Sequence, residues 1–167
     1  MRHGLVAIAG PEYADFVNFQ FVAHFIEVAI DSLTYQVRVP RAVSVVDCGR
    51  VVSARTARSQ VLGGLVWGIG AALREASEVD PRSGGFHSPN IAEYHVAVNA
   101  DIGEFMVEFI DEPDFTFSPL GAKGLGEVLM AGVAPAVANA IYHATGRRFR
   151  RLPIRLDDLH TTPPLTE

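Results

Sequence analysis

The segment GAKGLGE at residues 121–127 leads directly into the apolar run VLMAGVAPAVANAIYHA, and this junction organises the last third of the chain. The run repeats apolar residues with the spacing of one helical face, at Leu129, Val133, Val137 and Ile141. The glycines permit positive φ angles and close approach of another group, so the pattern predicts a tight turn that opens a helix. Glu127 stands at the predicted helix start, where unpaired backbone N–H groups gather. Two interpretations are open: an anion cradle with a poised base beside it, or an ordinary helix start capped by an acidic residue.

The rest of the sequence predicts a mixed α+β fold. Residues 19–31 and 35–47 are rich in β-branched and aromatic side chains and are separated by a short polar turn, which predicts a β-hairpin. IAEYHVAV at residues 91–98 and EFMVEFID at residues 104–111 predict two further strands.

Residues 56–77 predict a long helix with Thr56 as its N-cap. Its apolar face consists of Val61, Leu65, Ile69 and Leu73. The same segment contains glycines at positions 63, 64, 68 and 70. Each costs up to about 1 kcal/mol relative to alanine in a helix, so we expect a close neighbour against this helix. A tightly packed element or a bound cofactor would both explain it.

The C-terminal region contains residues that predict where its helices begin, bend or end. Pro135 predicts either a kink in the apolar helix or the first turn of its main segment. Gly146 predicts the end of that helix. Beyond it, FRRLPIRL predicts a short strand or extended segment, and LDDLH a last helical turn.

Charge and composition exclude several classes of protein. A net charge of -5 over 167 residues argues against nucleic acid as a partner, because binding phosphates requires a positive field. The single cysteine, Cys48, excludes an internal disulfide and iron–sulfur ligation by this chain, and we expect it to be buried. The six histidines show no paired ligand spacing, so no metal held by protein ligands is expected.

Hydropathy predicts a cytoplasmic protein without a membrane span. No apolar run approaches the roughly 20 residues that a span requires, and the apolar stretch after the first residues is too short for a signal peptide. Five arginines between residues 147 and 155 form the one basic cluster. They indicate a solvated helix end more readily than a phosphate site.

Four blocks carry a family resemblance: VVDCGRVV, RTARSQVLGGLVWGIGAAL, SPNIAEYHVAVNADI, and GAKGLGE followed by GVAPAVANAIYHATGRRFRRLPI. Together they resemble the C-terminal part of the molybdopterin-binding subunit of the xanthine dehydrogenase and aldehyde oxidase family, and are most similar to bacterial three-subunit enzymes. The blocks follow the family's order and approximate spacing between Phe21 and Leu159.

This resemblance implies a molybdenum-dependent oxidoreductase that hydroxylates an aldehyde or an N-heterocycle. It implies that Glu127, which ends the GxKGxGE-type motif, is the catalytic base. It further implies that Gln60, Lys123 and the backbone N–H groups of Gly124 and Gly126 contact the molybdopterin cofactor, although an exposed glutamine in a first helical turn also explains Gln60. Iron–sulfur clusters and FAD would reside on partner subunits, and the remainder of the molybdenum subunit would be a further partner.

The chain departs from the family in length and at single positions. We expect one partial molybdopterin-binding domain at residues 21–160, an unassigned segment at residues 1–20 and a tail at residues 161–167. Tyr35 replaces a hairpin-turn glycine, and Gly103 stands where proline is usual. Because most pterin and substrate contacts of the family lie in absent segments, a truncated, non-catalytic module that binds a partner is the main alternative. A nucleotide phosphate loop at GAKGLGE is a weaker one.

Overall fold

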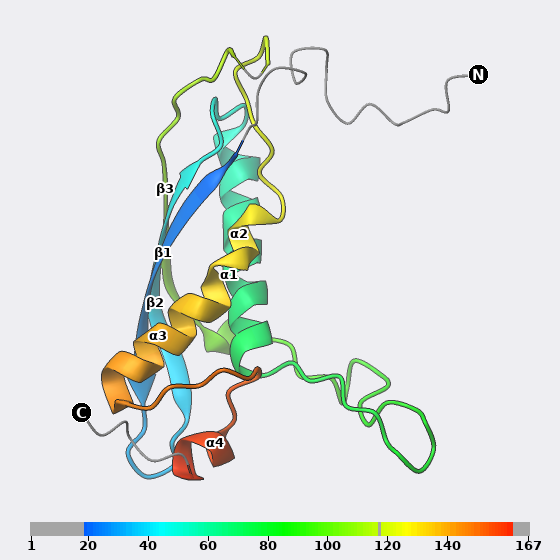
Figure 1. The fold of residues 1–167 in the computed structure, drawn as a ribbon. Helices are drawn as coiled ribbons and strands as arrows, with labels where there is room; N and C mark the ends of the chain where they lie inside the picture. The colour runs from blue at the N-terminus through cyan, green and yellow to red at the C-terminus, as the bar shows by residue number, and fades with distance from the viewer. Residues whose placement is uncertain (1–18, 117, 162–167) are drawn as a thin grey trace.

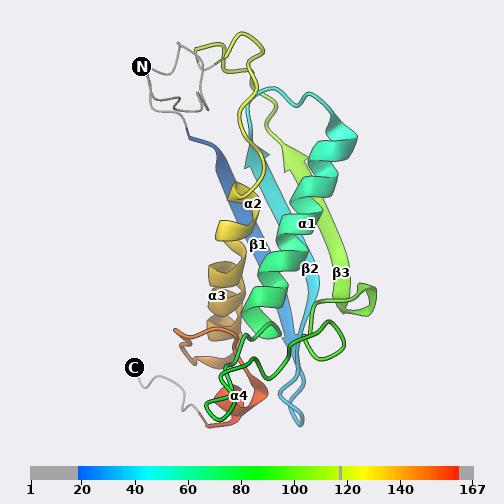
Figure 2. The same cartoon turned by 90° about the vertical axis from the view of Figure 1, so that its right-hand side faces the viewer.

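The computed structural model describes residues 19–116 and 118–161, and its centre is a three-stranded sheet with helices packed on one face (Figures 1 and 2). The arrangement is the α+β fold that the sequence predicts. Nearly all of the segment expected at residues 1–20, and the tail expected at residues 161–167 except its first residue, lie outside the described residues.

The sheet has the strand order β1-β2-β3. β1 (Phe21–Ile30) and β2 (Val37–Asp47) form the predicted antiparallel hairpin, and β3 (Ile102–Phe109) pairs with β2 in parallel. The hairpin turn is held by the Asp31 carboxylate, which accepts hydrogen bonds from the N–H groups of Leu33 at 3.0 Å and Thr34 at 2.7 Å. The alternation of β1 puts Val22, His24 and Ile26 on the helix-covered face.

The prediction of a strand at residues 91–98 is wrong. This segment is a loop, in which the carbonyl of Asn90 accepts the N–H groups of Glu93 and Tyr94 and so forms a turn instead of a ladder. The sheet gives the segment no partner, because β3 takes the position beside β2. A short 3-10 turn, η2 (Asn99–Asp101), connects the loop to β3.

α1 (Ala54–Leu73) begins two residues before the predicted start and ends four residues before the predicted end. The Thr56 hydroxyl does not cap it; that hydroxyl donates to the Ser53 carbonyl at 3.2 Å. The helix ends where the N–H groups of Arg74 and Glu75 both bond to the carbonyl of Gly70. The predicted apolar face is correct, since Val61, Leu65 and Ile69 are buried and Leu73 is half-buried.

The apolar run after the glycine-rich segment forms two helices, α2 (Val128–Ala131) and α3 (Val133–Thr145), which break at Gly132. Pro135 lies in the first turn of α3, as one of the two predictions requires, and Gly146 ends that helix with φ of 68°. The predicted last helical turn is α4 (Leu156–Thr161), whereas FRRLPIRL contains no strand.

The segment Val128–Thr145 has the length and hydropathy of a membrane span, so the expectation that no run approaches this length was wrong. The break at Gly132 divides the segment into two pieces. Its repeating apolar residues, Leu129, Val133, Val137 and Ile141, are fully buried in the core.

α1 packs against α2 and α3 through two of its glycines. A Cβ atom at Gly64 would lie 2.7 Å from the Cβ atom of Leu129, and one at Gly68 would collide with the side chain of Val133. Gly63, in contrast, has open space around it. Close helix packing therefore explains Gly64 and Gly68 but not every glycine of α1.

Candidate functional site

Two of the recognised sequence blocks meet at one end of β2. The residues after this strand, within VVDCGRVV, bond to the start of the glycine-rich segment: the N–H of Lys123 donates to the Cys48 carbonyl, and the N–H of Arg50 donates to the Gly121 carbonyl, both at 2.8 Å. Gly121 has φ of 74°, a left-handed conformation that favours glycine. The backbone of β2 thus fixes where the glycine-rich segment begins.

Lys123, the only lysine of the sequence, is held inside this junction. Its side chain is 10% exposed and forms ion pairs with Asp47 at 3.6 Å and Asp114 at 3.3 Å. The ammonium group therefore binds two carboxylates that come from different parts of the chain. This arrangement supports an anchoring role, and direct contact with a cofactor stays a prediction.

Glu127 occupies the N-cap position of α2, and its side chain is exposed. It makes no capping hydrogen bond. Among the described residues, no cation or hydrogen-bond donor pairs with its carboxylate. Glu127 thus stands at the predicted helix start without the hydrogen bond of a side-chain cap, and its carboxylate is available to another group.

The backbone leading to Glu127 offers several hydrogen-bond donors. Within the described part of the chain, the N–H groups of Gly124, Leu125, Gly126 and Glu127 have no acceptor. A Cβ atom at Gly126 would meet nothing within 4 Å, and one at Gly124 would touch only Gln20. A row of free N–H groups beside open space can donate hydrogen bonds to the oxygens of an anionic ligand. This donor set fits the phosphate and pterin oxygens of the expected cofactor.

Gln60 is exposed and lies in the second turn of α1, not in the first. Gly64 contacts Leu129 of α2, and Gly68, one turn later in α1, contacts Val133 of α3. α1 therefore runs parallel to the segment formed by α2 and α3. α2 begins at Val128 and the residues before it are not helical, so this parallel packing stops there. Among the described residues Gln60 has no hydrogen-bond partner, so its contact with the cofactor stays a prediction.

Cys48 lies at this junction but is 4% exposed. Burial raises the pKa of its thiol, and the nearby Asp47 and Asp111 carboxylates raise it further. The thiol stays protonated, which confirms the prediction of a buried, unreactive cysteine.

A buried polar pair below α2 has no obvious signal in the sequence. Nδ1 of His24 and the Ser44 hydroxyl are 2.7 Å apart, and Ser44 is completely buried. The sequence pattern places His24 only in the alternation of β1. Its partner is a serine within a run of valines, and that unexpected polar residue was the one available clue.

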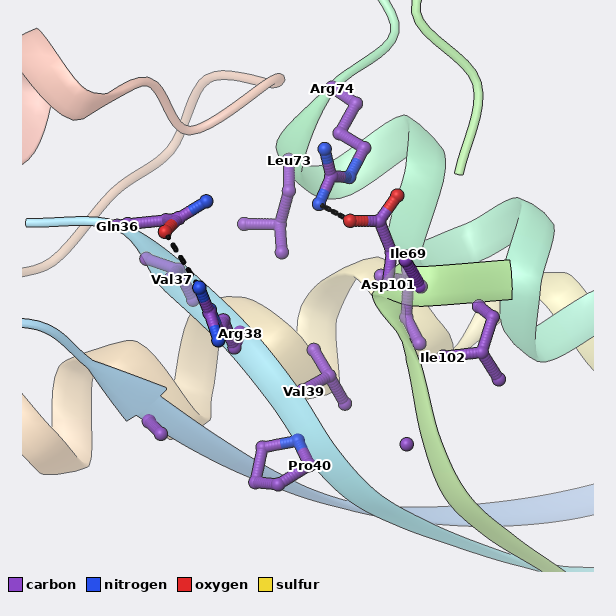
Figure 3. Close-up of a pocket in the computed structure, with 13 residues that line it drawn as sticks. Gln36, Val37, Arg38, Val39, Pro40, Ile69, Leu73, Arg74, Asp101 and Ile102 are labelled. Carbon is purple, nitrogen blue, oxygen red and sulfur yellow. Dashed lines mark hydrogen bonds and ion pairs between the residues drawn. The ribbon is translucent and has the colours of Figure 1, made fainter. Parts of the chain in front are cut away.

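A cavity lies away from this junction (Figure 3). It has a volume of about 490 Å³ and lies between the starts of β2 and β3 and the last turn of α1. The ion pair of Arg74 with Asp101, at 2.5 Å, and the hydrogen bond of Arg38 to Gln36, at 3.3 Å, flank its apolar walls. None of its lining residues belongs to the site predicted from sequence.

Comparison with known proteins gives a consistent result. A family model described as a molybdopterin cofactor-binding domain matches residues 8–103. The aldehyde oxidoreductase molybdenum-binding subunit PaoC of Escherichia coli strain K12 is 48% identical over 139 residues, which are 83% of this chain and 19% of PaoC. The putative xanthine dehydrogenase molybdenum-binding subunit XdhA of the same strain is 33% identical over 80% of this chain and 18% of XdhA.

The fold has matching solved structures. The aldehyde oxidoreductase from Desulfovibrio desulfuricans superposes with a TM-score of 0.77 and 27% identity over 86% of this chain and 16% of that protein. Quinoline 2-oxidoreductase from Pseudomonas putida 86 gives a TM-score of 0.71 and 26% identity over 81% of this chain and 18% of that protein. The chain spans less than a fifth of the length of each of these four relatives.

Proposed function

This chain belongs to the molybdopterin cofactor-binding family that forms the molybdenum-binding subunits of aldehyde and xanthine oxidoreductases, and from this we propose that it supplies the catalytic glutamate and part of the cofactor site of a molybdenum hydroxylase. The observation that carries the proposal is Glu127, an exposed carboxylate without a partner among the described residues, at the end of a row of free N–H groups.

Three groups of this chain would hold the cofactor. The N–H groups of Gly124 and Gly126 would donate to its oxygens, because they have no acceptor within the described residues. Gln60 would donate from the second turn of α1, where its side chain is exposed. Lys123 would act through its ion pairs, which hold the glycine-rich segment against β2. When bound, the cofactor supplies the two-electron oxidation of the substrate.

Glu127 would act as the general base. A carboxylate oxygen accepts the proton that is released as oxygen is transferred to an electrophilic carbon of the substrate. The lack of any competing partner among the described residues leaves both carboxylate oxygens free for this transfer. The substrate class is an aldehyde or an N-heterocycle, as the resemblance implies.

The chain would act together with other polypeptides. Its relatives are subunits more than five times longer than the matching segment, so the remainder of a molybdenum subunit is the first partner. Iron–sulfur and FAD subunits would remove electrons. We place the assembly in the cytoplasm and treat residues 21–160 as one domain within it.

The apolar surfaces of the chain support such a partner. Trp67 on α1 is 53% exposed, beside Leu62 and Val66, which are half-buried against the core. On the open face of the sheet, Phe25 and Met106 lie in one row across the strands and are 62% and 43% exposed. A helix that is apolar on several sides, and a sheet with an uncovered apolar face, are typical of elements buried in a larger body.

Glu127→Gln in the assembled enzyme tests the role of the base. Glutamine keeps the size and the hydrogen-bonding capacity of glutamate but cannot accept the proton, so kcat should fall by roughly 10²–10⁴-fold while bound molybdenum stays unchanged. Glu93→Gln is the matched control, because Glu93 accepts only a hydrogen bond from the Asn90 amide in an exposed loop. Near-normal turnover of Glu127→Gln, or a loss that merely follows the loss of molybdenum, would refute the proposed role.

The same apolar surfaces favour a second function, a non-catalytic module that binds a partner. Such a module would assemble with the remainder of the subunit in the same way. Substitution of Glu127 would then leave the turnover of the assembled enzyme unchanged. The nucleotide phosphate loop has less support. Its lysine would have to leave the Asp47 and Asp114 carboxylates, and the helix after the loop is only four residues long.

A further inference from the structure

α2, the helix that carries Glu127 at its start, is held from two sides. From α1, the backbone of Gly64 contacts Leu129 so closely that a Cβ atom would lie 2.7 Å from the Cβ atom of Leu129. From β1, the ring of His24 lies against Gly132, where a Cβ atom would be 3.0 Å from Cδ2 of that ring. Because α2 spans only four residues, these contacts set its position more than its own hydrogen bonds do.

The His24 ring is itself fixed by Ser44. The distance from Nδ1 of His24 to the Ser44 hydroxyl is 2.7 Å, and Ser44 lies on β2 with no exposed surface. The second nitrogen, Nε2, is buried without a hydrogen-bond partner among the described residues. Burial lowers the pKa of His24, and the Leu129 backbone opposes this shift only in part. The ring is thus a neutral, rigid support between the sheet and the helices.

We propose that His24, held by Ser44, is a positioning residue that sets the depth of α2 over the sheet and thereby the direction of Glu127. The inference rests on the proposed function of Glu127 as the base. His24 touches neither Glu127 nor the free N–H groups; it acts through Leu129, the second residue of α2, and through Gly132, which follows the last residue of α2. A general base loses rate steeply when it is displaced by about 1 Å, so small movements of α2 matter.

Two substitutions alter the contacts of the His24 ring, one on the side of Ser44 and one on the side of Gly132. Ser44→Ala removes the hydroxyl and leaves Nδ1 of His24 buried without its partner. Gly132→Ala adds a methyl group against the ring while the backbone, with φ of -89°, accepts alanine. The matched controls are Ser32→Ala in the exposed hairpin turn and Gly85→Ala in an exposed loop, where the nearest atom to an added Cβ is 3.6 Å away.

The first measurement uses the assembled enzyme. Ser44→Ala and Gly132→Ala should lower kcat per bound molybdenum by roughly 10- to 100-fold, with KM and molybdenum content unchanged. The reason is that each substitution alters only the position and direction of the Glu127 carboxylate. A purely structural role would instead lower the amount of folded, loaded enzyme and leave kcat per molybdenum intact. That result in both variants would overturn the inference.

The second measurement uses the 167-residue chain itself and does not depend on turnover. Amide hydrogen exchange in α2 should become roughly tenfold faster or more in Ser44→Ala, while exchange in the middle of α1 and α3 and in both controls stays unchanged. Unchanged exchange in α2 would overturn the inference as well. Normal turnover of the Glu127→Gln enzyme would refute the proposed function of Glu127 as the base. The hydrogen-exchange result would still decide whether His24 supports α2.

Discussion

At the scale of single residues, Tyr35 occupies a backbone conformation that favours glycine. It follows the hairpin turn with φ of 57°, a left-handed conformation that costs a residue with a side chain about 1–2 kcal/mol. The Tyr35 ring meets the edge of the His160 ring at 5.6 Å, and the Arg147 guanidinium lies 5.9 Å above it. These contacts join the hairpin to α4 and the end of α3, which a glycine at this position would not do.

Three of the five clustered arginines have partners within the chain. Arg147 bonds to the Leu159 carbonyl, Arg148 stacks on Tyr142 with 3.6 Å to the ring centroid, and Arg155 pairs with Glu78. These three side chains are occupied within the chain, which agrees with a solvated helix end rather than a phosphate site.

Lys123→Met should lower the free energy of unfolding of the isolated chain by about 1–3 kcal/mol. The substitution removes a largely buried cation and leaves Asp47 and Asp114 close together without it. Arg41→Met is the matched control: its pair with Glu27 is 59% exposed on both sides, so the change should stay within about 0.5 kcal/mol. Urea unfolding of both variants measures the difference, and equal effects would show that Lys123 does not anchor the glycine-rich segment.

At the scale of elements, α1 has two kinds of glycine on neighbouring residues. Gly64 is a contact point for Leu129 on α2, whereas Gly63 points into open space. The inherent helix propensity of the two positions is the same, so any difference in their response to substitution comes from packing alone.

Gly63→Ala and Gly64→Ala should therefore change stability in opposite directions. Alanine at position 63 gains helix propensity without a clash and should raise the free energy of unfolding by up to about 1 kcal/mol. Alanine at position 64 overlaps Leu129, and we expect a net loss of about 1–2 kcal/mol as α2 is displaced. Thermal unfolding followed by circular dichroism distinguishes them; stabilisation by both would mean that α2 is not packed on Gly64.

At the scale of the whole molecule, the β-sheet has one face covered by helices and one uncovered face. α1 and α3 cover one face of the sheet, and the other face has no layer over it within the described residues (Figures 1 and 2). Phe21 and Phe25 on that face are each more than 60% exposed. Trp67 adds a second apolar surface on α1. An isolated domain seldom leaves such surfaces uncovered.

The purified chain should therefore self-associate and bind hydrophobic dyes. Phe25→Glu and Trp67→Glu should each reduce dye binding and shift sedimentation toward the monomer, because they put a charge on one apolar surface. Val79→Glu, on an exposed loop residue away from both surfaces, controls for the added charge. A dilute wild-type sample that sediments as a monomer and binds no dye would contradict the proposal that these surfaces face a partner.

Local patterns in the sequence were sufficient for much of the secondary structure. The hairpin, the buried face of α1, the end of α3 at Gly146 and the family itself follow from the spacing of apolar residues, from turn residues and from four recognised blocks. These features depend on neighbours along the chain or on motifs, so a sequence states them directly.

Only the tertiary structure decided the features that join distant segments. The parallel pairing of β3 with β2, the loop in place of a strand at residues 91–98, the two carboxylates around Lys123 and the His24–Ser44 pair all depend on partners far apart in sequence. The same holds for Glu127: the sequence allowed a cap or a free carboxylate, and the choice depended on which donors the fold brought near it. The physical reason is that hydrogen bonds and ion pairs act over a few ångströms, and the distance between two side chains is set by packing of the whole chain and not by their separation along it.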